Sequence, residues 1–135
     1  MKNARILLVD DDQPIRAALR RAFDREGYTV LEATNGIEAL KVVESQPVDL
    51  VVTDIIMPDS EGIELTFALR KLHPTLPVIA MSGGGDWAPE PYLAIARTAG
   101  AAHVLVKPFV TDDLLACVRS TLGEDAGTQN AAVGE

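Results

Sequence analysis

The chain has 135 residues, with 12 Lys and Arg against 20 Asp and Glu, so its formal net charge is −8 and its length fits one ordinary domain. Hydrophobic residues make up 47% of the chain and charged residues 24%, so a core can be buried and a wholly disordered chain is excluded. Twelve basic residues in an acidic chain are too few to favour binding to a nucleic-acid phosphate backbone or to an anionic lipid surface. We therefore expect no direct nucleic-acid partner.

The cysteine content and the N-terminus indicate the compartment. The single cysteine, Cys117, cannot form an internal disulfide and suits a reducing environment. No apolar run is long enough to span a bilayer, and the short apolar run that follows Asn3 ends at Asp10, unlike a signal peptide. We expect a cytoplasmic protein without membrane insertion.

Short aliphatic runs alternate with longer segments of helical period. This alternation predicts an α/β fold in which helices cross over between the strands of a parallel sheet. Several runs are apolar throughout, as expected for strands that are buried on both faces. The five predicted strands are residues 4–9, 28–33, 48–53, 77–82 and 103–106.

Three of the intervening segments place their apolar residues on one side of a helix. Spacings of three and four residues predict helices that each bury one stripe against the sheet. The stripes are Ile15, Ala18, Leu19, Ala22 and Phe23 in the first helix, Leu65, Ala68, Leu69 and Leu72 in the third, and Leu114, Cys117, Val118 and Leu122 in the last. Gly27 and Gly100 are expected to end the first and fourth helices.

Capping residues mark the starts of two helices. Asn35 opens the second helix, and Glu38 stands three residues later, as in a capping box. Thr111 is the predicted N-cap of the last helix, with Asp112 and Asp113 in the first turn, where the helix dipole favours them. Beyond Leu122 the residues are small and polar without periodicity. The sequence thus predicts one domain over residues 1–122 and a flexible tail over residues 123–135.

Polar side chains collect where the predicted strands end. Taken singly, each has a structural explanation as a turn residue, a helix cap or a solvated charge. Because the carboxyl ends of parallel strands meet at one edge of a sheet, where ligands bind, we expect them to form one site. These residues are Asp10, Asp11 and Asp12 after the first strand, Asp54 after the third, Ser82 and Gly83 at the fourth, and Lys107 after the fifth.

The acids at this edge require cations. Two carboxylates about 4 Å apart repel by roughly 4 kcal/mol at an effective dielectric constant of about 20. One divalent metal ion together with Lys107 would balance the charges of Asp10, Asp11 and Asp54. Ligands that offer oxygen alone favour Mg²⁺ or Mn²⁺ over zinc and leave coordination positions for water or phosphate oxygens. The pattern therefore predicts metal-dependent phosphate chemistry.

A set of motifs extends over residues 5–122: Val9-Asp10-Asp11, Asp54 followed by Met57-Pro58 and Gly62, Ser82, and Lys107-Pro108-Phe109. With these motifs the chain resembles the receiver domain of two-component response regulators. The resemblance implies a flavodoxin-like, doubly wound sheet of five parallel strands in the order 2-1-3-4-5, with five helices.

The resemblance also implies a role for each acid and its neighbours. Asp54 would be the phosphoacceptor, whose carboxylate attacks a phosphoryl group and becomes an aspartyl phosphate. Asp11 would bind Mg²⁺ directly, Asp10 would bind it largely through water, and the backbone carbonyl of Ile56 would complete the protein ligands, together with Asp54.

Three further positions would act on the phosphoryl group itself. Lys107 would pair with one phosphoryl oxygen and the hydroxyl of Ser82 would move to donate to another, with the amide of Gly83 nearby. The strand-five position that is often aromatic in the family is Val104, so no aromatic ring is available to swing inward behind Ser82. The loop over residues 83–92, which contains Trp87, is longer than in many members and fits either a mobile lid or a surface insertion.

The main interpretation is a stand-alone receiver that takes its phosphoryl group from a histidine kinase or phosphotransfer protein. It would catalyse only its own phosphorylation and dephosphorylation, and it would signal to an unknown target by protein contact. Three alternatives stay open. One is a small Mg²⁺-dependent phosphatase with its nucleophile on the first strand, since Asp10 and Asp12 form an Asp-x-Asp pair. Another is a docking module that is never phosphorylated. The third is a flavodoxin-like nucleotide binder, which the three acids disfavour because they repel phosphate.

Overall fold

A computed structural model describes residues 3–55, 61–82, 94, 97–106 and 110–123. Strands and helices alternate along the chain for most of its length. The strands are β1 (Arg5–Val9), β2 (Thr29–Ala33), β3 (Leu50–Asp54), β4 (Val78–Ser82) and β5 (His103–Val106). The helices are α1 (Gln13–Arg25), α2 (Gly36–Ser45), α3 (Glu61–Leu72) and α5 (Thr111–Leu122).

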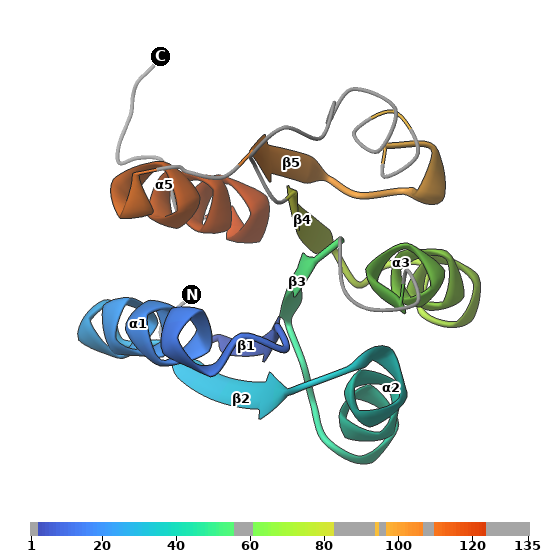
Figure 1. Cartoon of the computed structure of the whole chain (residues 1–135), viewed down its shortest axis with the longest axis horizontal. Helices are drawn as coiled ribbons and strands as arrows, with labels where there is room; N and C mark the ends of the chain where they lie inside the picture. The colour runs from blue at the N-terminus through green and yellow to red at the C-terminus, as the bar shows by residue number, and fades with distance from the viewer. Residues whose placement is uncertain (1–2, 56–60, 83–93, 95–96, 107–109, 124–135) are drawn as a thin grey trace.

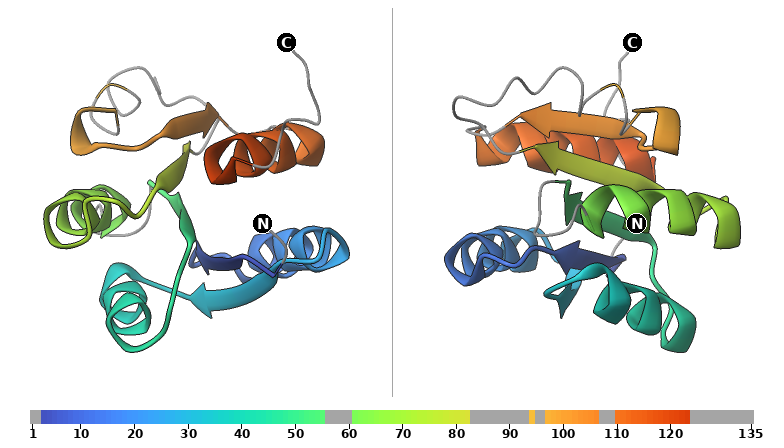
Figure 2. Two further views of the ribbon diagram at one scale, coloured as in Figure 1. Left: turned by 180° about the vertical axis from the view of Figure 1, so that it is seen from behind. Right: turned by 45° about the vertical axis from the view of Figure 1, so that its right-hand side comes forward.

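All five strands run parallel in one sheet, in the order β2-β1-β3-β4-β5. Helices α1 and α5 cover one face of the sheet, and α2 and α3 cover the other (Figure 1). The view from behind shows the same two layers of helices (Figure 2, left). The predicted doubly wound α/β fold and strand order are confirmed.

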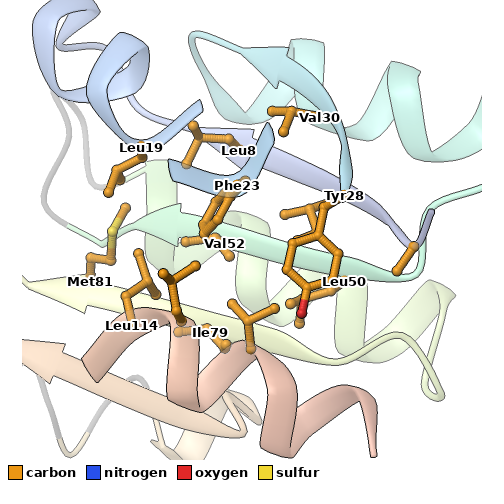
Figure 3. Packing of buried hydrophobic residues seen from close by; sticks show 14 residues of the cluster. Leu8, Leu19, Phe23, Tyr28, Val30, Leu50, Val52, Ile79, Met81 and Leu114 are labelled. Carbon is orange, nitrogen blue, oxygen red and sulfur yellow. The ribbon is translucent and has the colours of Figure 1, made fainter. Parts of the chain in front are cut away.

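The core has two layers because successive strand residues point to opposite faces of the sheet. In β1, Leu8 packs with Phe23 of α1 and Leu114 of α5, whereas Leu7 packs with Leu69 of α3 on the other face. The first of these layers is drawn in Figure 3, where the ring of Phe23 lies among strand and helix side chains. The edge of Phe23 also contacts the ring of Tyr28, with centroids 6.4 Å apart.

The predicted strands are present, and their ends differ from the prediction by at most two residues. The largest shift is in β3, which covers Leu50–Asp54 and not residues 48–53. Asp49, just before it, instead accepts a hydrogen bond at its carboxylate from the backbone N–H of Arg5, at 2.8 Å. Asp54 is consequently the last residue of a buried strand, and its backbone is held by the sheet.

Two residues of the predicted helix stripes are not buried. Ala18 of α1 is exposed, and Leu72 at the end of α3 is 56% exposed. Both lie at the margin of a stripe, where periodicity alone does not determine how far the sheet extends. The rest of these stripes, including Cys117, is buried or partly buried. Gly27, just after the C-cap of α1, and Gly100, just after helical residues 97–99, have positive φ angles of 91° and 107°, so their predicted roles as helix ends are confirmed.

The caps confirm one prediction and correct another. The side chain of Asn35 accepts a hydrogen bond from the backbone N–H of Glu38, at 2.9 Å, so the predicted cap of α2 is confirmed. The carboxylate of Glu38 reaches back one residue further than in a capping box, to the N–H of Thr34. Thr111 is not the N-cap of α5. It is the first helical residue, and Val110 holds the cap position without a side-chain hydrogen bond.

Several predicted features lie outside the described residues. These are the loop over residues 83–92 with Trp87, most of the fourth helix, and the tail after Gly123. Of the fourth helix, residues 94 and 97–99 are described, and they are helical. Among the described residues, every helix is too short or too polar to cross a membrane.

Candidate functional site

Asp10 and Asp54 lie side by side at the carboxyl edge of the sheet. β1 and β3 are neighbours, and their register ends with Val9 opposite Thr53, so the next residues along the two strands are the two aspartates. Both are buried, at 0% and 6% exposure, whereas Asp11 is exposed. One carboxylate oxygen from each of these three residues lies within 4.8 Å of the other two. The predicted convergence of Asp10, Asp11 and Asp54, here called the acidic cluster, is confirmed.

The backbone and a helix side chain hold Asp10 in place. Its N–H donates to the carbonyl of Ala33 in β2, at 3.2 Å, which extends the pairing of β1 beyond its last strand residue. Its own carbonyl accepts from Nη1 of Arg16, at 2.7 Å. Its carboxylate oxygen Oδ1 accepts from the N–H of Asp12, at 2.9 Å. Three contacts thus fix both the backbone and the carboxylate of this buried acid.

Close packing of backbone positions Asp54. α3 approaches the end of β3 at Gly62, where a Cβ atom would lie 2.0 Å from the carbonyl oxygen of Asp54 and 2.6 Å from the Cα of Ile55. Real Cβ atoms do not come so close to backbone, so only glycine fits here. The N–H of Ile55 donates to the carbonyl of Met81, at 2.8 Å, and ties the chain after Asp54 to β4.

Asp12 has a structural role. It is the N-cap of α1, and its Oδ1 accepts a hydrogen bond from the N–H of Ile15, at 3.2 Å. It is not one of the three carboxylates that converge among the described residues. The Asp-x-Asp pair of Asp10 and Asp12 therefore divides between the acidic cluster and a helix cap, which weakens the phosphatase interpretation.

The structure describes the other predicted site residues only in part. Ser82 ends β4 and lies opposite Val106 in the register, and Met81 lies opposite Asp54, so the backbone of Ser82 is at the same edge as the acidic cluster. Ile56, Gly83 and Lys107 lie outside the described residues. Val104 is partly buried against Ile55 and Ala80.

An ion-pair network beside Asp10 was not predicted from the sequence. Glu32 of β2 contacts both Arg16 and Arg20 of α1. Burial raises the pKa of Glu32, but the hydrogen bonds and charges of Arg16 and Arg20 outweigh burial and lower the pKa below its usual value. The available signal was weak: two arginines four residues apart on a helix, and the only charged residue of the strand Thr29–Ala33.

The acidic cluster fits a hard divalent cation. Two oxygens bound to one Mg²⁺ at about 2.1 Å are at most about 4.2 Å apart. Carboxylate oxygens within 4.8 Å of one another reach that spacing by small side-chain adjustments. Two of the three acids are buried, where like charges repel more strongly than in water. The donor set and its charge both favour occupation by a cation such as Mg²⁺ or Mn²⁺.

The fold is a doubly wound α/β domain, and the acidic cluster is a candidate cation site. The site lies at the ends of β1 and β3, the neighbouring strands from which the connections lead to opposite sides of the sheet. The chain belongs to the response regulator receiver domain family, whose model matches residues 6–119. Members of this family interact with histidine kinases and downstream targets, typically bind Mg²⁺, and are not classical enzymes. The chain is accordingly a receiver domain of two-component signalling.

Individual relatives agree with this assignment. Response regulator MprA of Mycobacterium ulcerans is 38% identical over 120 residues, which cover 89% of this chain and 50% of that protein. The chain thus spans about half the length of the curated relatives it matches.

Solved receiver structures agree with the fold. A CheY-like receiver domain protein from Methanospirillum hungatei has a TM-score of 0.79 at 33% identity, with 90% of this chain and 94% of that chain covered. The receiver domain of NtrX from Brucella abortus has a TM-score of 0.81 at 30% identity, covering 89% and 99%. These neighbours confirm the predicted flavodoxin-like fold with five strands and five helices.

Proposed function

We propose that Asp54 is the phosphoacceptor of this receiver domain and that Asp10, Asp11 and Asp54 hold the Mg²⁺ ion on which phosphorylation depends. The observation that carries the proposal is the convergence of these three carboxylates within 4.8 Å at the end of the two central strands. Of the three, Asp54 alone lies within a strand, with Gly62 packed against its backbone. A rigid backbone suits a nucleophile, because its position relative to the donor then varies little.

The reaction is a transfer of a phosphoryl group between two proteins. A carboxylate oxygen of Asp54 attacks the phosphorus of a phosphohistidine on a histidine kinase or phosphotransfer protein, and an O–P bond forms as the P–N bond breaks. The electron pair of the broken bond stays on the imidazole, which takes up a proton from solvent. When bound, Mg²⁺ supplies positive charge that offsets the carboxylates and the phosphoryl oxygens.

The remaining roles rest on the family resemblance. Lys107 pairs with a phosphoryl oxygen, Ser82 donates its hydroxyl to another, the amide of Gly83 lies beside them, and the carbonyl of Ile56 is a further metal ligand. Ser82 lies at the end of β4, next to β3, and this position supports its role as a donor to the phosphoryl group. The domain catalyses its own phosphorylation and dephosphorylation and turns over no other substrate.

The domain boundaries and the output are also part of the proposal. We assign residues 1–122 to the receiver and the following residues to a tail, and we expect the phosphorylated domain to signal by contact with a downstream protein. The half-buried lone cysteine, Cys117, supports a reducing compartment and thus the cytoplasm.

Intact-protein mass spectrometry tests the proposal. The protein is incubated with acetyl phosphate, with and without Mg²⁺, as wild type, as Asp54→Asn and as Asp12→Asn. The matched control keeps the helix cap, because asparagine caps as well as aspartate. We expect one added phosphoryl group that requires Mg²⁺, is absent in Asp54→Asn and persists in Asp12→Asn.

Other results would select other functions. A phosphoryl group that persists in Asp54→Asn would locate the nucleophile elsewhere and favour Asp10 and the phosphatase. No phosphorylation of the wild type under any condition, together with no binding of Mg²⁺, would favour a docking module.

A further inference from the structure

The ion-pair network beside the acidic cluster has a direct contact with it. Arg16 uses two separate donors: Nε donates to Oε1 of Glu32, at 2.8 Å, and Nη1 donates to the backbone carbonyl of Asp10, at 2.7 Å. Both bonds are short and charge-assisted, and such bonds are about twice as strong as neutral ones. The guanidinium of Arg16, a residue of α1, therefore links the backbone at the end of β1 to a side chain of β2.

The orientation of Arg16 is fixed by its surroundings. Its side chain is only 13% exposed, and Glu32 faces α1 because it lies opposite Leu8, whose side chain packs under α1 and α5. Glu32 binds a second arginine, Arg20, one turn along the same helix. Arg20 has no hydrogen bond to Asp10 among those described, and its other charged contact is Asp24, at 3.7 Å.

We propose that Arg16, oriented by Glu32, is a positioning residue for the metal site: its bond to the Asp10 carbonyl fixes the turn that carries Asp10 and Asp11. The proposal rests on the proposed function, because it concerns the affinity of the acidic cluster for Mg²⁺. Arg16 does not contact the metal, and it acts through the Asp10 backbone.

Several contacts hold the same turn, and Arg16 supplies one of them. Asp12 caps α1 at the far end of the turn, and its N–H holds the carboxylate of Asp10. These contacts are local, within five residues of one another. Arg16 adds a side-chain link from the turn to β2 through Glu32, sixteen residues away in sequence, beside the backbone bond from the Asp10 N–H to Ala33. Without Arg16, the turn keeps its cap and that backbone bond but loses the bond to the Asp10 carbonyl.

The direction in which Arg16→Met changes the affinity for Mg²⁺ distinguishes a positioning role from a purely electrostatic one. Arg16 carries a positive charge next to a site for a cation, so its charge alone weakens Mg²⁺ binding. If charge were its main effect, Arg16→Met would bind Mg²⁺ more tightly than the wild type. If it positions the turn, Arg16→Met binds more weakly, by about tenfold, as is usual for groups that orient metal ligands.

The experiment measures the dissociation constant of Mg²⁺ by isothermal titration calorimetry on the full chain, with Mn²⁺ as a second probe. The variants are Arg16→Met, Arg16→Lys, Glu32→Gln and, as the matched control, Arg20→Met. We expect affinity losses of about tenfold for Arg16→Met and less for Arg16→Lys and Glu32→Gln. Arg20→Met removes the same charge one turn away and is expected to bind Mg²⁺ as the wild type does, within about twofold.

Urea unfolding of each variant without metal separates a positioning role from a general loss of stability. Arg16→Met and Arg20→Met are both expected to lose stability, since both lose a contact with Glu32, but of these two only Arg16→Met is expected to lose metal affinity. If Arg16→Met does not fold, Arg16→Lys and Glu32→Gln still carry the test.

Unchanged or tighter binding of Mg²⁺ in the Arg16 variants, while the wild type binds Mg²⁺ and is phosphorylated on Asp54, overturns this inference and leaves the proposed function intact. A wild type that binds no divalent cation overturns both.

Discussion

The ends of β1 and β3 bring buried carboxylates to the same edge of the sheet, but they hold them by different means. Asp10 donates its N–H to the carbonyl of Ala33 and accepts hydrogen bonds from the N–H of Asp12 and the side chain of Arg16. Asp54 is the last residue of its strand, and the backbone of α3 packs against it at Gly62. A turn held by polar contacts can be adjusted by mutation, whereas close packing of backbone tolerates almost no change. Under the proposed function, the β1 end would tune metal affinity and the β3 end would fix the nucleophile.

The largest effect is expected at the β3 end. Gly62→Ala would place a Cβ atom 2.0 Å from the carbonyl oxygen of Asp54, so α3 or the strand end must move. We expect a loss of about 3 kcal/mol in the free energy of unfolding, measured by urea denaturation. Gly27→Ala is the control, since Gly27 has a φ of 91° with open space around it. The control loses about 1 kcal/mol from backbone strain alone. Equal losses in the two variants would show that close packing at Gly62 is unimportant.

At the β1 end, the cap of α1 has a smaller expected effect. Asp12→Ala removes the acceptor for the N–H of Ile15 and is expected to lower the free energy of unfolding by about 1 kcal/mol. Asp12→Asn keeps an acceptor and is expected to stay near the wild type. Urea denaturation of both variants measures the cap, and mass spectrometry checks phosphorylation in parallel. A loss of phosphorylation in Asp12→Asn would contradict the purely structural role of this residue.

The smallest effect concerns the dependence of stability on pH at Glu32. The two arginines lower its pKa below the usual 4.5, so the ionised group stabilises the fold fully above that pH. The contribution is lost as pH falls through the lowered pKa of the folded state, where Glu32 takes up a proton. We expect the free energy of unfolding of the wild type to exceed that of Glu32→Gln by about 0.5 kcal/mol at pH 7 and in low salt, as is usual for partly exposed ion pairs.

Urea denaturation of both proteins from pH 7 to pH 3 follows this difference. It should shrink below about pH 4.5 and also shrink at pH 7 in high salt. A difference that grows as the pH falls would show that the ionised form of Glu32 does not stabilise the fold.

Most of the fold and part of the site could be predicted because they depend on local pattern. Aliphatic runs predicted five strands to within two residues, and the acids at their ends predicted the acidic cluster. Errors occurred where burial depends on how far another element reaches. Leu72 continues the stripe of α3 but is 56% exposed, and Thr111 has the chemistry of a cap but is the first residue of α5.

The sequence by itself determined the order of the elements, the parallel sheet and the residues available at its carboxyl edge, because side-chain period and turn chemistry act over a few residues. Only the tertiary structure decided which of those residues join the acidic cluster, which cap a helix and which contact distant elements. The spacing of Asp10, Asp11 and Asp12 does not distinguish ligand from cap, and nothing local connects Arg16 to Glu32 or Gly62 to Asp54. Those relations depend on where α1 and α3 pack on the sheet, and packing is decided by the whole core.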